Sequence, residues 1–595
     1  MVFARLALAF SVAQGVLACG GHDHSHAQRA YPPTKLRPPT RPLDWGDFNV
    51  LHTTDTHGWL LGHQKESWPE PNYSGDLGDL ASFLVHMKRI AEEKDVDLLV
   101  VDSGDIHDGT GITDGFPPGG VDGHDANEFI KQIPYDIMAI GNHELYHYGY
   151  TLDMYRNFAP DLNGRYLSSN VNITVFGENN ETINVPVGER VAKFRTRKGR
   201  RVTSFGVLFD FTGNDDNTTV QTVEDMVKED WFVDAIQEEP DVFLLVGHMP
   251  VNEDNWPLLD GRSMALQSGR YMETLGWMSA NLNENDSDNI TFSRRYLDPN
   301  RVTYQFHTLT SNDTFDSEEG TTITQGLLDL ADQYDLDHLY GTAPMDYTVN
   351  RVPYPSNSSL LSLYISEAAP LVLGANNTAN STLPALFLTN SNAQRFDLYK
   401  GPFTENDRLS LSPYIQSWMY VPEVEYGLAK QVLDIINADD SDNRRRGMDD
   451  QERVLFGVGC DAQVDNRYRA WLRDVVARTY AERERELRWD ADDELSIGYV
   501  TYDSCPGVGD DTEHEPIPSY PVPVAIQSKV TLNGTILDGV TDDTLIDFVV
   551  VAFNADQVAE TLNSIVGEDR FSVRGAYSPV LSNELLGFYA QMAWN

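Results

Sequence analysis

Short apolar runs, each ending in a polar cluster, recur along the first half of the chain from residue 48. These runs are "FNVLH", "VDLLVV", "YDIMAI", "TSFGVLF" and "DVFLLV". Because nearly continuous apolar runs are typical of strands buried on both faces, they predict a central sheet. Apolar residues at helical spacing between the first two runs predict an amphipathic helix over residues 79–93. This alternation predicts an α/β fold with functional residues in the loops after the strands.

A second set of apolar runs begins after residue 335. "SLLSLYI" and "PALFLT" predict further strands, and residues 468–487 predict a long helix after a polar linker. The chain has 595 residues, more than one hydrophobic core usually serves. We therefore expect two domains, over residues 46–335 and 336–595.

The N-terminus has the pattern of an export signal. A basic residue, Arg5, precedes an apolar stretch that ends in small residues before Ala18, which predicts a signal peptide over residues 1–18. A lipoprotein-type modification of Cys19 is the alternative. Residues 19–45, rich in His and then Pro, should form an extended leader. Recurrent Asn-X-Ser/Thr sequons suit a secreted, extracellular glycoprotein.

Net charge limits the classes of molecule that the protein can bind, and the cysteines allow one disulfide. The 91 acidic residues exceed the 44 basic ones and give a formal net charge of -47, which disfavours binding to nucleic acid and to anionic membranes. An anionic substrate would then need local positive charge from metal ions or a few arginines. No later apolar run is long enough to span a bilayer. Cys460 and Cys505 could pair in an oxidising compartment, but the sequence leaves this open.

Candidate chemistry lies at four of the strand ends. "TTDTHGW" supplies Asp55 and His57, "DSGDIHDG" supplies Asp105, "IGNHE" supplies Asn142 and "VGHMP" supplies His248. Carboxylates, imidazoles and an amide carbonyl suit borderline divalent ions of the Zn, Mn or Fe type. Four such clusters, each directly after an apolar run, predict a metal centre.

The motifs D-X-H, G-D-X-X-D-G, G-N-H-E and G-H resemble those of the calcineurin-like metallophosphoesterases, and "TTDTHGWL" narrows the resemblance to the secreted 5'-nucleotidase group. The resemblance implies a sandwich of two sheets flanked by helices, followed by a C-terminal α/β nucleotidase-type domain. It also implies two divalent metal ions. Asp55 and His57 would hold the first ion, Asn142 and His248 the second, and Asp105 would bridge both.

By the same resemblance the protein hydrolyses phosphomonoesters, with nucleotides expected, by attack of a metal-bound hydroxide. His143 would be the catalytic residue that contacts the transition-state oxygens or the leaving group. Asp108 or Glu144 could orient it, although a turn or surface role would suit either carboxylate. Cyclic nucleotides, nucleotide sugars and phosphoproteins are the alternative substrates.

The second half of the chain resembles the substrate-binding segment of the same nucleotidases. "LTNSNAQRFDLYKGPFTENDRLSLSPY" matches an Asn-rich turn before a phosphate-binding arginine, and "YDSCPGVGDD" loosely matches a segment with a second aromatic wall for the base. The candidates are Asn390, Arg395, Tyr414, Tyr502 and Asp510.

One motif of the family is missing. A G-H-X-H strand should follow His248, but neither the motif nor an apolar run occurs between Pro250 and Leu275. Three explanations are open: the sequence lacks a segment that the active protein has, the protein is a weakened enzyme, or it is a catalytically inactive binding module. Glu253 and Asp254 could replace the lost ligands, whereas His307 is expected to be a packed core residue.

Overall fold

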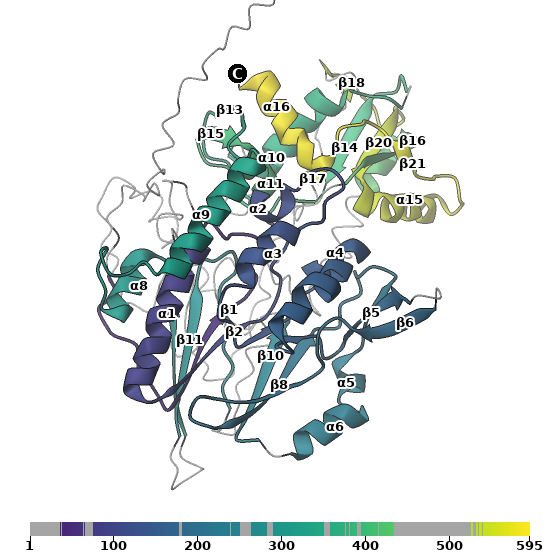
Figure 1. The fold of residues 1–595 in the computed structure, drawn as a ribbon. Helices are drawn as coiled ribbons and strands as arrows, with labels where there is room; N and C mark the ends of the chain where they lie inside the picture. Colours follow the sequence, from purple (N-terminus) through teal and green to yellow (C-terminus); the bar gives the residue numbers. More distant parts are fainter. Residues whose placement is uncertain are drawn as a thin grey trace, which may run out of the picture.

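The computed structural model places two α/β units side by side, with chain positions from about 40 to 335 in one and from 339 onward in the other (Figure 1). Residues 1–35, 250–262 and 433–524 lie outside the described part, as do shorter stretches that include 66–74, 283–289, 351–357 and 390–393. The expected signal peptide, most of the leader, the helix over 468–487 and both deep cysteines therefore lie outside it.

The first unit is built on a mixed sheet whose order is β12-β11-β1-β2-β3-β4. Four neighbouring strands are parallel, and β11 and β12 add to them in antiparallel fashion. The predicted strands at "FNVLH", "VDLLVV" and "YDIMAI" are confirmed in this sheet. Its strands are β1 (Phe48–Thr53), β2 (Asp97–Asp102), β3 (Ile137–Ala139), β4 (Tyr166–Leu167), β11 (Leu275–Asn281) and β12 (Thr291–Leu297).

A second sheet of order β10-β8-β7 packs against the first and completes the expected sandwich. The interior between them is aliphatic: Val50 and Val101 of the first sheet belong to the same buried cluster as Val202 and Val246 of the second. The predicted strands at "TSFGVLF" and "DVFLLV" are confirmed here. These strands are β7 (Ala192–Arg195), β8 (Arg201–Leu208) and β10 (Val242–His248); a smaller sheet holds β5 (Val171–Phe176), β6 (Thr182–Pro186) and β9 (Thr218–Val220).

Helices cover the other face of the first sheet. The helix predicted over 79–93 is α1 (Leu77–Lys94), which buries Leu80, Phe83, Leu84 and Met87 and begins at an Asp76 capping box. It packs along α9. The remaining helical elements of this unit are α2 (Gly111–Asp114), α3 (His124–Ile130), η2 (His143–Leu145), α4 (Tyr148–Asp153), η3 (Met154–Phe158), η4 (Ala159–Leu162), α5 (Val223–Met226), α6 (Asp230–Gln237), α8 (Arg301–Thr308) and α9 (Glu318–Gln333).

The second unit has a seven-stranded sheet of order β19-β18-β14-β20-β16-β21, in which β17 also pairs with β14. The predicted strand at "PALFLT" is β14. The elements are β13 (Leu339–Ala343), β14 (Ala385–Thr389), β15 (Gly401–Thr404), α11 (Glu405–Leu411), β16 (Trp418–Glu425), β17 (Ala525–Ile526), β18 (Thr531–Leu532), β19 (Thr535–Ile536), β20 (Leu545–Val551), α15 (Ala552–Val566), β21 (Arg574–Ala576), η8 (Ser582–Glu584) and α16 (Leu585–Ala593).

The strand expected at "SLLSLYI" is wrong, because this run forms α10 (Leu360–Ser362) and the start of the π-helix η5 (Leu363–Leu373). The element is buried almost all round, with Leu363, Tyr364, Ile365 and Ala368 inside. A run that is apolar on every side has no periodicity that separates a buried helix from a buried strand.

The two units meet where α2 contacts α11. The Asn406 Oδ1 atom accepts the backbone N–H of Gly111 at 2.9 Å. The Lys65 ammonium also donates to the Asp407 carboxylate at 2.9 Å. None of the helices among the described residues is both long and apolar enough to cross a membrane.

We expect Trp277→Ala to lower the free energy of unfolding by about 3–5 kcal/mol, because it empties a fully buried site in β11. The indole also donates to the Asp44 carbonyl at 3.0 Å. Chemical denaturation followed by circular dichroism measures the change. Phe176→Ala is the control, since Phe176 is 54% exposed. Equal effects of both changes would contradict the place of β11 beside β1.

Candidate metal centre and substrate site

The polar clusters singled out in the sequence converge at one edge of the sandwich. Asp55 and His57 follow β1, Asp105 follows β2, Asn142 follows β3 and His248 ends β10. β1, β2 and β3 are parallel to one another, so the loops after them open on the same side of the first sheet. His248, at the end of β10 in the second sheet, lies 3.1 Å from Asp105 and so reaches the same place. The convergence that the sequence predicted is therefore present.

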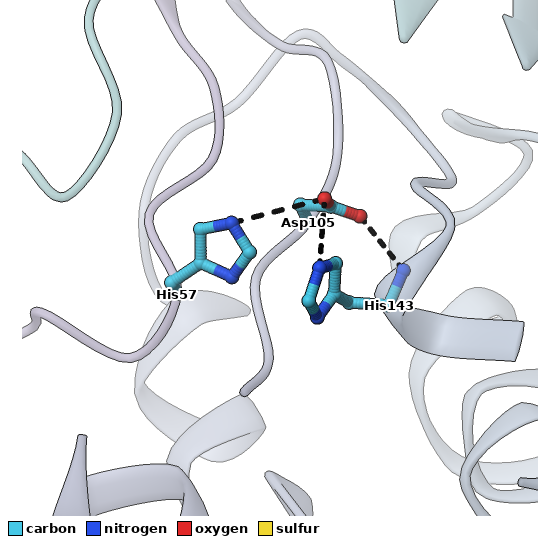
Figure 2. Close-up of side chains that lie close together, drawn as sticks. All are labelled: His57, Asp105 and His143. Carbon is cyan, nitrogen blue, oxygen red and sulfur yellow. Dashed lines mark hydrogen bonds and ion pairs between the residues drawn. The ribbon is translucent and has the colours of Figure 1, made fainter. Parts of the chain in front are cut away.

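Asp105 lies at the centre of the group. Its Oδ2 atom is 3.1 Å from His248 Nε2, 3.7 Å from His143 Nε2 and 3.8 Å from His57 Nε2. Figure 2 shows His57 and His143 on two sides of this carboxylate, with the backbone N–H of His143 donating to Oδ1 at 2.8 Å. Nearby carboxylate and imidazole atoms form two candidate ligand groups: His57, Asp105 and His143, and Asp55, Asp105 and His248.

The two flanking histidines are turned so that Nε2 faces the centre. His57 Nδ1 lies 2.7 Å from the carbonyl of His107, and His248 Nδ1 lies 2.9 Å from the carbonyl of Ser103. A carbonyl can only accept, so Nδ1 carries the proton in each ring and a neutral ring has its lone pair on Nε2. A backbone acceptor behind a histidine is the usual way to orient a metal ligand.

The backbone at the site is unusual. Asp55, His57, Asp105 and Asp108 all have positive φ, between 44° and 59°. Left-handed backbone is unfavourable for residues with a Cβ and clusters at functional sites, where the surrounding structure compensates its cost. The loops that carry the candidate ligands are thus held in a conformation that local sequence preferences alone would not select.

Glu144 holds two of these loops together. Its fully buried carboxylate accepts the N–H groups of Gly141 at 2.8 Å and Ile106 at 2.9 Å, with longer contacts to those of Asp105 and His107. The acceptor therefore joins the loop after β2 to the loop after β3. A Cβ at Gly141 would collide with the Asp105 carboxylate, so only glycine allows this approach.

His143 is oriented by Asp108 and not by Glu144. His143 Nδ1 lies 2.8 Å from Asp108 Oδ2, and both side chains are buried. Burial would raise the pKa of Asp108, but the hydrogen bond from His143 lowers it to about 2. Neither carboxylate has the turn or surface role considered for it from the sequence.

The charges at the site are mutually dependent. Burial opposes ionisation of Asp105, yet the neighbouring His248 and His143 hold its pKa well below the usual range. Burial would likewise lower the pKa of His248, but Asp105 raises it to about 10. The donor set, two carboxylates with imidazole nitrogens, fits borderline divalent ions, which would take over the charge compensation that His248 provides here.

Two of the expected substrate residues approach this centre from the second unit. Arg395 lies over the rings of Tyr414, 5.6 Å from its centroid, and Tyr271, 6.0 Å from its centroid. The Tyr414 ring lies 6.4 Å from that of His143. Asn390, Tyr502 and Asp510 lie outside the described residues, so their positions remain predictions.

Sequence reasoning missed two aromatic residues at the centre. The backbone N–H of Tyr271 donates to the Asp55 carbonyl at 2.7 Å, and its ring meets the edge of His57. The hydroxyl of Tyr146 accepts from Asn142 Nδ2 at 3.0 Å, which turns the Asn142 carbonyl oxygen toward His248. Tyr146 directly follows the "GNHEL" motif, and that adjacency was the available signal.

The fold around β10 is relevant to the missing G-H-X-H motif. β10 is an edge strand of its sheet, and its side chains Phe243 and Leu245 are 52% and 61% exposed. Residues 263–274, the described part of the connection to β11, contain no strand. His307 lies buried in α8, in agreement with its expected core role, while Glu253 and Asp254 lie outside the described residues.

Comparisons with known proteins match both units of the chain to known families. Residues 48–304 match the family model for the calcineurin-like phosphoesterase, and residues 346–559 match that for the NAD nucleotidase C-terminal domain. A "Secreted protein" of Arthroderma benhamiae is 32% identical over 677 residues, covering 100% of this chain and 98% of that protein. An uncharacterized Schizosaccharomyces pombe protein is 30% identical, covering 90% and 88%.

The chain belongs to the calcineurin-like phosphoesterases.

A 5'-nucleotidase from Candida albicans has 28% sequence identity and a TM-score of 0.73, and the match covers 93% of this chain and 99% of that one. A 5'-nucleotidase precursor from Thermus thermophilus, at 13% identity and a TM-score of 0.53, shares the fold over 92% of this chain and 96% of the other. This phosphoesterase is therefore a hydrolase of the 5'-nucleotidase type, with the two-domain fold that the sequence predicted.

We expect Glu144→Gln to destabilise the phosphoesterase domain by about 2–4 kcal/mol, because an amide replaces a charged acceptor and directs N–H groups at backbone donors. Thermal unfolding with and without added Mn²⁺ measures this. Glu93→Gln, at an exposed pair with Arg89 on α1, is the control with little expected effect. A wild-type melting curve for Glu144→Gln would contradict the role of Glu144 as the link between the loops.

Proposed function

We propose that this protein hydrolyses phosphomonoesters of nucleotides at a centre of two divalent metal ions. The observation that carries the proposal is the arrangement around Asp105, where imidazoles, a second carboxylate and the Arg395 guanidinium from the other domain face one small volume. A doubly charged phosphate needs positive charge of this kind, which is scarce in a chain with a net charge of -47.

Asp55 and His57 would hold one ion, Asn142 and His248 the other, and Asp105 would bridge them. The orientation of the two rings by backbone carbonyls and of the Asn142 amide by Tyr146 supports these roles. When bound, the ions would neutralise the phosphate and favour ionisation of a water molecule for in-line attack. Their number and identity are part of the proposal.

The protein's own groups then act on the leaving group and the phosphate. Asp108 accepts the Nδ1 proton of His143, so Nε2 is the atom that exchanges a proton with the substrate. Arg395 would bind the phosphate as a fixed cation. Its Nε atom is buried without a hydrogen-bond partner among the described residues, which leaves it available for an anion.

Base recognition is proposed from the resemblance. Tyr414 would form one wall of a stacking slot, with Tyr502 as the other and with Asn390 and Asp510 as polar contacts, since stacking contributes about 1–3 kcal/mol per base. The match to an NAD nucleotidase C-terminal domain keeps dinucleotides and nucleotide sugars as alternative substrates.

We also propose that the protein is secreted after cleavage of residues 1–18, and that the boundary between its two domains lies at 335/336.

A second candidate follows from β10, which pairs on one side only among the described strands. The exposed Phe243 and Leu245 suit a sheet that lacks a covering segment among the described residues. The chain as given would then be an impaired or inactive binding module, while a longer form would be the full enzyme. Transcript sequence across codons 250–270 tests this directly.

The function is tested by phosphate release from AMP, a cyclic nucleotide, NAD and a phosphopeptide with Mn²⁺ or Zn²⁺ present. We expect AMP to be the preferred substrate. Asp105→Asn should abolish the rate, His143→Gln should lower kcat by about 10²–10⁴-fold, and Arg395→Lys should mainly raise KM. Arg165→Lys, at a surface pair with Asp136, is the control. A chain that binds no metal and releases no phosphate would sink the enzymatic proposal for this polypeptide.

Metal binding should release protons at pH 7.5. The pKa of His248 is raised to about 10 beside Asp105, so the metal-free ring is protonated there and must lose its proton to become a ligand. Calorimetric titration with Mn²⁺ in buffers of different ionisation enthalpy measures the release. We expect about one proton fewer for His248→Asn. Binding without proton release would contradict His248 as a ligand.

A further inference from the structure

Three carboxyl groups lie together behind the catalytic histidine. Asp108, Asp114 and Asp122 each place an oxygen within 4.8 Å of the other two, and they come from the segment between β2 and α3. Asp122 lies deepest, with 2% of its surface exposed. The proposed function uses only Asp108, so it gives no reason for two further buried carboxyls at this place.

The contacts of the three groups differ. Asp108 accepts from His143 Nδ1 at 2.8 Å, and Asp114 accepts the backbone N–H of Gly109 at 2.8 Å. The Asp122 Oδ1 atom is buried without a hydrogen-bond partner among the described residues. None of the ion pairs found in the described part of the chain involves Asp114 or Asp122. Asp122 thus has carboxyl neighbours but no countercharge of its own.

Three ionised carboxylates cannot share so small a buried volume, because like charges and burial both favour the neutral form. One proton must therefore be bound within the group. We propose that Asp122 is a neutral carboxylic acid. Its O–H group donates a hydrogen bond to the neighbouring Asp108–Asp114 pair and so positions Asp108 for its hydrogen bond with His143. Asp122 is a positioning residue on this reading, and its effect on catalysis rests on the proposed function.

The surrounding groups are consistent with this assignment. Burial and then the Asp114 charge raise the pKa of Asp122 well above its usual value, and burial raises that of Asp114 to about 7. His107 also acts on Asp108, and its Nε2 atom lies 3.1 Å from the Oδ1 atom of Asn127. Tyr150 and Tyr334 also face the carboxyls, and both have raised pKa values, so they add no charge near neutral pH.

A bound cation is the physical alternative to a bound proton. Calcium or magnesium would pair with ionised oxygens, and the group would then depend on all three charges. The two cases differ in what an amide does at position 122. Asparagine has the shape of a neutral aspartic acid and keeps a hydrogen-bond donor, but it removes one charged ligand from a cation site.

The first experiment compares the melting temperature of the full-length wild type with that of Asp122→Asn from pH 5 to pH 8. The folded protein keeps a proton on Asp122 that the unfolded chain releases above about pH 4, so the wild type should lose stability relative to the variant as pH rises. We expect the melting temperature of Asp122→Asn to rise steadily relative to that of the wild type as the pH increases toward 8. Asp332→Asn, at an exposed carboxyl on the same domain, should show no such trend.

The second experiment compares hydrolysis by Asp122→Asn and Asp122→Ala. Asparagine should keep kcat within about twofold of the wild type, whereas alanine, which cannot donate, should lower kcat about tenfold or more with KM unchanged. The pH profile of kcat should shift for the alanine variant only, because Asp108 is then no longer held in position for its hydrogen bond with His143.

Equal losses for asparagine and alanine would overturn the donor role. A flat pH trend, or an asparagine variant that is less stable than the wild type at pH 8 and has lost calcium or magnesium, would overturn the neutral acid. A wild type without phosphatase activity would defeat the proposed function instead. The pH trend of the melting temperature would still decide the state of Asp122, because it requires no turnover.

Discussion

The carboxylate of Glu144 is the contact on which the site depends. It collects backbone N–H groups from the loops after β2 and β3, which also meet through the close approach of Gly141 to Asp105 and through the hydrogen bonds of His143. Both loops contain left-handed residues or close contacts that a free peptide would not adopt. The Glu144 carboxylate thus accepts several buried backbone N–H groups that would otherwise lack a partner. The position of Asp105, the central carboxylate of the proposed metal centre, depends on this arrangement.

Charge balance explains much of the remaining architecture. The protein is strongly acidic overall, and its site concentrates further carboxylates in a buried volume. His248 beside Asp105 and the guanidinium of Arg395 supply positive charge, and divalent ions would add to it. On the far side of His143, none of the ion pairs found among the described residues involves Asp122, and the proton that we propose there would lower the charge of the cluster. The protein thus has two carboxylate clusters, one beside imidazoles and one made of carboxyl groups alone.

Short-range pattern located the polar residues that converge in the fold, because each of them directly follows a buried strand. Asp55, Asp105, Asn142 and His248 could each be placed directly after a strand from the order of apolar runs and polar clusters. The same logic failed at "SLLSLYI", where burial on all sides leaves a helix and a strand with the same pattern. It also left Asp108 and Glu144 interchangeable, since both are acidic residues next to the motif and only their contacts separate them.

The sequence by itself determined the family, the α/β class and the residues that meet around Asp105, because these follow from the order of strands and the polar residues behind them. Tertiary structure decided which atom of each histidine faces the centre, since that depends on carbonyls such as those of Ser103 and His107 that come from other loops. It also decided that Arg395 reaches the site and that Asp122 lies buried among carboxyls. Both facts depend on contacts between segments far apart in the chain, which local patterns do not record.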